Sequence, residues 1–199
     1  MEKINLIKEY PAYYKANGNP VEIEVEQINC LTISGIGAPD GASFQNSIGA
    51  LYAVAYTVKK YSTSDQRDFV VPKLEAFWWV EEGLVFEETP QEDWHWQLMI
   101  RMPEFVTNDP VDQAVEEVIK KKQIVLANEV QLKPIHEGKS VQVLHKGSYD
   151  EEGPSINKIM EYMKINGLQM NGHHHEIYIS DPTKTPEEKL KTIIRYAVK

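Results

Sequence analysis

Residues 75–79 read Glu-Ala-Phe-Trp-Trp, and residues 176–179 read Glu-Ile-Tyr-Ile. In each segment a glutamate stands ahead of large apolar side chains, as in a β-strand with one face on a core. The order of strand, glycine loop, long helix and strand occurs in both halves of the chain. This repeat predicts two similar lobes side by side, with helices packed on one face of an antiparallel sheet, and therefore the α+β class.

The other elements are predicted from the hydrophobic period. Apolar residues at steps of four, three, four and three predict a helix over about 42–60. Asp109 and Pro110 stand in the favoured order of cap and first-turn proline, and Gly153 and Pro154 precede another apolar helical stripe. Strands are predicted near 21–36 (one long strand or a pair), 74–80, 94–102, 130–136, 140–147 and 174–180, and 190–198 is a short helix or strand.

The chain has 199 residues, which suits one large domain or two small halves that share a core. We expect residues 1–20 to be an N-terminal lead-in and residues 21–199 to form a single domain. Within that domain, module one covers about 21–107 and module two about 108–199.

The composition excludes several classes of protein. With 21 Lys and Arg against 30 Asp and Glu, the net charge is −9, which disfavours binding to nucleic acid. Cys30 is the single cysteine, so an internal disulfide is excluded and a reducing, cytoplasmic location is predicted. We expect no signal peptide, no membrane span and no cofactor. The residue pattern does not indicate whether the protein is a monomer or an oligomer.

Glu176 is the strongest candidate for a functional residue. On a strand, Ile177 and Ile179 share one face, while Glu176 and Tyr178 share the other. If the isoleucines pack beneath the helices, Glu176 and Tyr178 lie on the helix-free face. The same register in the first half places Phe77 and Trp79 on that face, where large rings need a cover or a ligand.

The residue pattern leaves alternatives open at these positions. Each tryptophan is either a core residue or a wall of the site. Glu176 either reaches solvent or is partly desolvated, in which case its pKa is raised. Tyr56 either covers the edge of the core together with Tyr52, one helical turn away, or supplies a hydroxyl donor to the site.

A metal site is not predicted at His173, His174, His175 and Glu176. On a strand these residues give only two ligands per face, whereas a zinc site needs three or four protein ligands.

Several longer segments resemble the GyrI-like small-molecule-binding proteins over nearly the whole chain. They are residues 51–56 (Leu-Tyr-Ala-Val-Ala-Tyr), 72–75, 78–79, 94–96 and 99–101 in the first half, and 143–150 and 174–182 in the second. Lys146 and Ser148, around Gly147, depart from the Gly-Pro that this family shows before the tyrosine. The shape of that loop is therefore not predicted.

The resemblance implies two βαββ modules related by a pseudo-twofold, as in the effector domains of BmrR-like multidrug-sensing regulators. It also implies that the glutamate of the Glu-Ile-Tyr segment, here Glu176, lies at the centre of the binding pocket. Similar stand-alone proteins include hydrolases that open the cyclopropane of alkylating natural products of the yatakemycin and duocarmycin type. Others inhibit DNA gyrase.

We therefore predict a protein that binds, and in one interpretation detoxifies, flat aromatic or cationic xenobiotics. Glu176 would be the anchor or the base, and Tyr56 the hydroxyl donor. In the enzymatic interpretation these two residues open a cyclopropane by activating water. The predicted walls of the site are Phe77, Trp79, Trp96, Tyr149 and Tyr178. The alternatives are a protein-interaction module such as a gyrase inhibitor, or a ligand sensor without a DNA-binding domain.

Overall fold

The segment 21–36 forms two strands that have different neighbours. β1 (Val21–Val25) pairs with β6 (Gly138–Lys146), whereas β2 (Ile28–Ile36) pairs with β4 (His95–Arg101) and β5 (Gln131–Ile135). The structure is a computed structural model that describes residues 3–199. The chain divides into unit 1, which holds Ile28–Ile135 and the chain up to Leu6, and unit 2, which holds Ile7–Gln27 and His136–Lys199.

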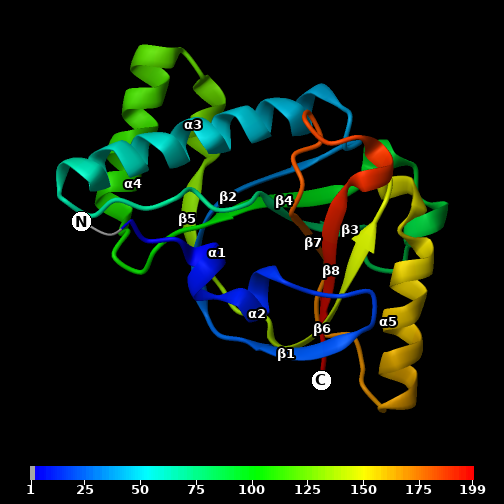
Figure 1. The fold of residues 1–199 in the computed structure, drawn as a ribbon. Coiled ribbons are helices and arrows are strands. Elements are labelled where there is room, and N and C mark those ends of the chain that lie inside the picture. The colour runs from blue at the N-terminus through cyan, green and yellow to red at the C-terminus, as the bar shows by residue number, and fades with distance from the viewer. Residues whose placement is uncertain (1–2) are drawn as a thin grey trace. The chain divides into compact units, whose positions relative to one another are not determined.

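Unit 1 contains antiparallel strands in the order β3-β4-β2-β5, with β3 at Glu75–Trp79. The long helix α3 (Ala42–Ser64) packs on one face of them (Figure 1). Phe44 of α3 stacks on Trp78 with ring centroids 5.0 Å apart. Four of the five apolar residues of the predicted helical stripe are buried: Phe44, Leu51, Ala55 and Val58. α4 (Asn108–Glu117) continues into a π-helical turn at Val118–Lys122.

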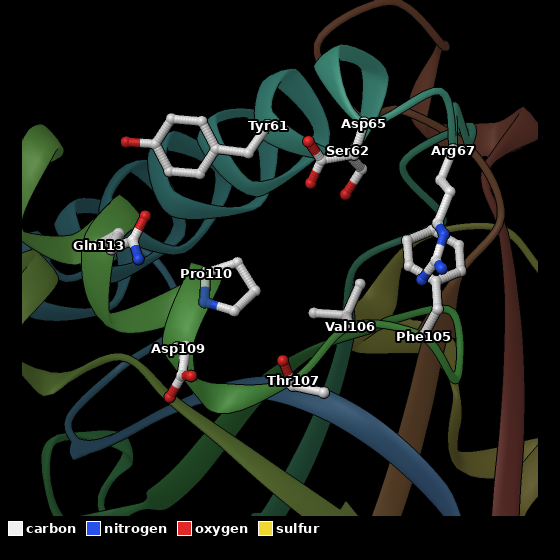
Figure 2. Close-up of a pocket in the computed structure, with 10 residues that line it drawn as sticks. All are labelled: Tyr61, Ser62, Asp65, Arg67, Phe105, Val106, Thr107, Asp109, Pro110 and Gln113. Atoms are coloured by element: carbon white, nitrogen blue, oxygen red, sulfur yellow. The ribbon is translucent and has the colours of Figure 1, made fainter.

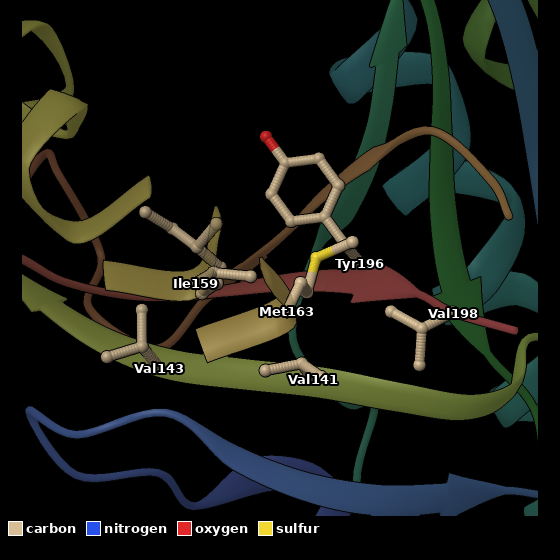
Figure 3. Close-up of a cluster of buried hydrophobic side chains, with 7 residues drawn as sticks. Val141, Val143, Ile159, Met163, Tyr196 and Val198 are labelled. Atoms are coloured by element: carbon tan, nitrogen blue, oxygen red, sulfur yellow. The ribbon is translucent and has the colours of Figure 1, made fainter. Parts of the chain in front are cut away.

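Unit 2 contains antiparallel strands in the order β1-β6-β8-β7, with β7 at His174–Tyr178 and β8 at Lys191–Ala197. α5 (Gly153–Ile165) packs on one face through Ile159 and Met163, which meet Ile194 of β8 in a buried apolar cluster (Figure 3). The full cluster is Val141, Val143, Ile159, Met163, Ile194, Tyr196 and Val198. Full burial of such a side chain stabilises a fold by about 1.5–3 kcal/mol.

The opposite face of the unit 2 strands carries charge instead of a purely apolar core. Arg195 of β8 is fully buried there, and its guanidinium donates to Glu137 Oε2 (3.2 Å), to Gln142 Oε1 (2.8 Å) and to the carbonyl of Tyr13 (2.7 Å). Tyr13 belongs to α2 (Pro11–Tyr14), and its ring centroid lies 4.1 Å from the Arg195 guanidinium carbon. The segment expected to be a lead-in thus contacts this face through Tyr13.

Short elements complete the chain. The remaining α-helix is α1 (Leu6–Glu9). The 3₁₀ turns are Phe86–Glu88, Gln91–Asp93, Val125–Glu129, Tyr149–Glu151 and Glu187–Lys189. None of the helices described within residues 3–199 is long and apolar enough to cross a membrane.

The predicted α+β class with antiparallel strands is confirmed. Unit 1 follows the order β2-α3-β3-β4 and unit 2 the order β6-α5-β7-β8, so each contains one βαββ module. The strand that precedes each module pairs with the other module's first strand: β1 with β6, and β5 with β2.

Candidate functional site

Glu176 lies on the face of the unit 2 strands that α5 covers. It is paired with Ile194 across β7 and β8, so the two side chains share a face, and Ile194 packs against Ile159 of α5. The predicted helix-free position is therefore wrong. Alternation along a strand separates two faces, but it does not show which face the helix covers. Here Ile177, on the opposite face, is fully buried as well.

Glu152 joins this face from the start of α5. Gly147 turns the chain with a φ of +129°, a backbone conformation that favours glycine. The His145 ring contacts the Ser148 carbonyl through Nε2 (2.9 Å) and Ser155 Oγ through Nδ1 (3.1 Å), which fixes the entry into the helix. Glu152 is the residue before the first turn of α5, and it is buried.

His174 lies between the two carboxylates. Its Nε2 is 2.9 Å from Glu176 Oε1 and 3.6 Å from Glu152 Oε2, and its Nδ1 is 2.6 Å from the Tyr196 hydroxyl. Carboxylate oxygens of Glu152 and Glu176 also lie within 4.8 Å of each other. We call these four residues, Glu152, His174, Glu176 and Tyr196, the carboxylate–histidine cluster. Their side chains are mostly shielded from solvent, and that of Glu176 is 12% exposed.

The cluster separates the pKa values of its carboxyl groups. Burial and the negative charge of Glu176 raise the pKa of Glu152 to about 8. Burial alone would lower the pKa of His174, but hydrogen bonds to Glu152 and Glu176 raise it well above its ordinary value. Burial opposes ionisation of Glu176 too, yet the hydrogen bond and charge of His174 lower its pKa. At neutral pH the cluster therefore holds a neutral Glu152, an imidazolium and an ionised Glu176.

The raised pKa expected for Glu176 belongs to Glu152 instead. The strand pattern places His174 on the same face as Glu176, but the two residues were considered only as metal ligands, and the effect of His174 on the pKa of Glu176 was left out. Glu152 itself was not among the predicted site residues. An acidic residue just before a helix is ordinary in any protein, so its position in the sequence carries no signal.

Two predicted aromatic residues border the cluster. Tyr149 and Tyr178 meet edge to face with ring centroids 5.7 Å apart, and Tyr149 is 38% exposed. Burial, followed by the negative charges of Glu176, Glu152 and Asp181, raises the pKa of Tyr149 to about 12. The Tyr149 phenol is therefore a neutral donor beside an anionic carboxylate.

The other predicted wall residues are in unit 1, on two different faces of its strands. Trp96 is paired with Trp78, is 1% exposed and meets Phe44 edge to face, so it packs in the core beneath α3. Phe77 and Trp79 alternate with Trp78 and lie on the opposite face, half-buried. The structure thus does not bring Trp96 onto one face with Phe77 and Trp79.

Tyr56 is exposed on α3, also in unit 1. Its ring stacks beside that of Tyr52 with centroids 6.1 Å apart, and 55% of the residue is accessible. Trp79 stacks on His95 with centroids 5.6 Å apart. These rings belong to unit 1, whereas the titratable groups of the carboxylate–histidine cluster are in unit 2.

The cluster also has a spacing that a cation could use. Ligand atoms of Glu152, His174 and Glu176 all lie within 4.8 Å of one another. The strand places only two ligands, His174 and Glu176, on this face. Glu152, at the start of α5, is the third. Both ring nitrogens of His174 are nevertheless engaged, with Tyr196 and with Glu176. We therefore describe the three groups as a hydrogen-bonded unit and not as a metal centre.

A cleft of about 360 Å³ lies elsewhere in unit 1, between the end of α3 and the start of α4 (Figure 2). Its lining includes Asp65, Arg67 and Asp109, and the Arg67 guanidinium lies 5.6 Å from the Phe105 ring centroid. None of the predicted site residues lines this cleft. Its lining residues also do not form a buried cluster of acidic and basic side chains like that of Glu152, His174 and Glu176. Volume alone does not make it a better candidate than the cluster.

Known proteins resemble this chain over its whole length. Residues 19–199 match the family described as GyrI-like small molecule binding domain. A search of curated proteins found no match. An uncharacterized conserved protein from Listeria innocua is 37% identical, with a TM-score of 0.92, over 99% of this chain and 100% of that one. A hydrolase from Listeria innocua is 36% identical, with a TM-score of 0.91, over 100% of both chains. The C-terminal domain of EcmrR, at 16% identity and a TM-score of 0.58 over 91% of this chain and 97% of that one, shares the fold.

Proposed function

Because this chain belongs to the GyrI-like family of small-molecule-binding domains, we propose that it binds flat aromatic cations at the carboxylate–histidine cluster. Glu176 would be the anchoring charge. The observation that carries this proposal is the Glu176 carboxylate, which is 12% exposed, lies 2.9 Å from His174 and stands beside two tyrosine rings.

Three physical effects support the choice of a cation. A partly buried carboxylate attracts a positive charge more strongly than one in bulk water, because less solvent screens it. The faces of Tyr149 and Tyr178 can add cation–π attraction of about 0.5–2 kcal/mol each. The net charge of −9 also raises the local concentration of cations.

The test uses a matched pair of ligands, the permanently charged N-methylphenanthridinium and its uncharged parent phenanthridine. We expect the wild type to bind the cation more tightly at pH 7. Glu176→Gln should weaken the cation about tenfold, which corresponds to about 1.4 kcal/mol, and should leave the parent compound almost unaffected. Titration calorimetry measures both affinities.

Glu151→Gln is the matched control, since Glu151 is an exposed neighbour of the same charge. It should bind both compounds like the wild type. Equal affinity of the wild type and Glu176→Gln for the cation would show that Glu176 is not the anchor.

We propose hydrolysis as a second function of the same site, because two relatives 36% identical over their whole chains are described as hydrolases. Opening of a cyclopropane conjugated to a carbonyl needs a base that takes a proton from water and an acid at the carbonyl oxygen. Glu176, ionised at neutral pH, is suited to be the base. Tyr56, the acid predicted from the sequence, belongs to unit 1 and is exposed on α3, so its part in this reaction stays a prediction.

Incubation with a cyclopropane-bearing alkylator of the duocarmycin type distinguishes catalysis from binding. Wild type should release the ring-opened alcohol over many turnovers, and Glu176→Gln should lose about 10²-fold or more in rate. Mass spectrometry of the products measures the turnover. Protection of the compound by one equivalent of protein without any product would reject the enzymatic role and keep the binding role.

A further inference from the structure

The carboxylate–histidine cluster contains two carboxyl groups and only one imidazole. Glu152 comes from the start of α5, and His174 and Glu176 come from β7, so two separate elements bring the three groups together. The imidazole contacts both carboxylates, at 2.9 Å and 3.6 Å. One imidazolium can balance one carboxylate charge, and the second carboxyl group then meets an anion at short range.

Among residues 3–199, the groups that shift the pKa values of the cluster include no second positive charge for Glu152. The ionisable groups recorded against the cluster within residues 3–199 are phenols and a further acid. They are Tyr149 before α5, Tyr178 on β7, Tyr196 on β8 and Asp181 after β7. His145 on β6 is engaged with Ser148 and Ser155. A neutral, protonated Glu152 is therefore the form that this arrangement favours, in agreement with the upward direction of its pKa.

One oxygen of Glu152 is not used by the fold. Its Oε2 faces His174, but Oε1 is buried and makes no hydrogen bond to any residue in the described chain, 3–199. A buried polar atom without a partner costs about 1–3 kcal/mol, so such atoms are uncommon unless a ligand or water completes them. The structure thus provides a buried oxygen that a bound molecule can contact, and once Glu152 has lost its proton this oxygen can only accept hydrogen bonds.

We propose that the cluster exchanges a proton for an organic cation: Glu152 is protonated in the free protein and releases its proton to solvent when a cation binds beside Glu176. The exchange balances in charge and atoms, because one positive charge enters, one proton leaves, and no covalent bond other than the Glu152 O–H is broken. This inference rests on the proposed binding function and adds a second residue and a pH dependence to it.

The exchange has a consequence for ligand choice. An uncharged aromatic compound gives no reason for Glu152 to ionise, so it should bind without proton release. A bound cation supplies the second positive charge that the cluster lacks. Glu152 can then ionise, and both carboxylates, Glu152 and Glu176, attract the cation. Affinity for cations should rise with pH through about 8, where half of Glu152 is ionised in the free protein, and level off above that value.

Calorimetry in buffers of different ionisation enthalpy counts the released protons. We expect N-methylphenanthridinium at pH 7 to release close to one proton per molecule bound to the wild type, with a smaller number at pH 9. Phenanthridine should release none. Glu152→Gln, whose amide resembles the protonated acid, should bind the cation more weakly and release none. Glu151→Gln should match the wild type.

The outcomes separate the two proposals. Cation binding without proton release in the wild type at pH 7 would overturn the exchange while leaving the binding function intact. Proton release by Glu152→Gln at the wild-type level would overturn the exchange as well, because another group would then be the source. Absence of any binding of the cation would instead reject the proposed function.

Discussion

Individual buried charges set the pH response of unit 2. Glu137 contacts His175 Nδ1 through both oxygens at 3.1 Å and Arg195 Nη1 at 3.2 Å. Burial would raise the pKa of Glu137, but the charges and hydrogen bonds of His175 and Arg195 lower it to about 2. A lowered pKa in the folded protein means that the ionised form contributes stability above the ordinary value of 4.5. That contribution is lost as the pH falls toward 2.

We therefore expect Glu137→Gln to lower the free energy of unfolding by about 3 kcal/mol at pH 7, because it leaves Arg195 buried without its counter-charge. The difference from the wild type should shrink between pH 4.5 and pH 2 as the wild-type carboxylate is protonated. Urea unfolding across this range measures it. Glu187→Gln, an exposed acid in the same unit, should behave like the wild type. A gap that stays constant down to pH 2 would contradict the assigned role of Glu137.

At the scale of single residues, the sequence identified Glu176, one of the four residues of the cluster. Glu176 was found because an acid among rings on a strand is unusual. Glu152 was missed because α5 separates it from β7, and no local pattern links the two. The direction of the Glu176 pKa was wrong for the same reason, since it depends on which neighbours the fold supplies.

Secondary-structure elements were predicted well where a hydrophobic period was sustained. The helix expected at 42–60 is α3 (Ala42–Ser64), and the strand expected at 74–80 is β3 (Glu75–Trp79). The uncertain segment 190–198 is the strand β8. Its residues are buried on both faces, so the alternation that would have indicated a strand is missing.

The packing between helices and strands could not be predicted from the spacing of apolar residues along the sequence. Trp96 reaches the core only because Gly35, opposite it on β2, has no side chain: a Cβ there would lie 2.4 Å from the indole. A tryptophan on an alternating strand fits a core and a binding site equally well in the sequence. The contact with glycine and the buried Phe44 assign it to the core.

On the scale of the whole molecule, the repeat predicted two similar lobes, the family resemblance implied two βαββ modules, and each unit contains one such module. No single boundary in the sequence separates the two units, because each unit contains two separate segments of the chain. β1 belongs with the second module and β5 with the first, so the units exchange their leading strands. Such an exchange leaves no mark in the hydrophobic pattern, because β1 and β5 would have the same alternation beside either module.

The most direct test of the cluster as the small-molecule site is carboxyl ¹³C NMR of protein labelled in its glutamate side chains. The Glu152→Gln, Glu176→Gln and Glu151→Gln variants assign the three resonances. On addition of N-methylphenanthridinium at pH 7, the Glu152 resonance should move from the protonated to the ionised position, and that of Glu176 should shift while remaining ionised. The Glu151 resonance should stay in place. Saturation with the cation while Glu152 and Glu176 remain unchanged would contradict the account.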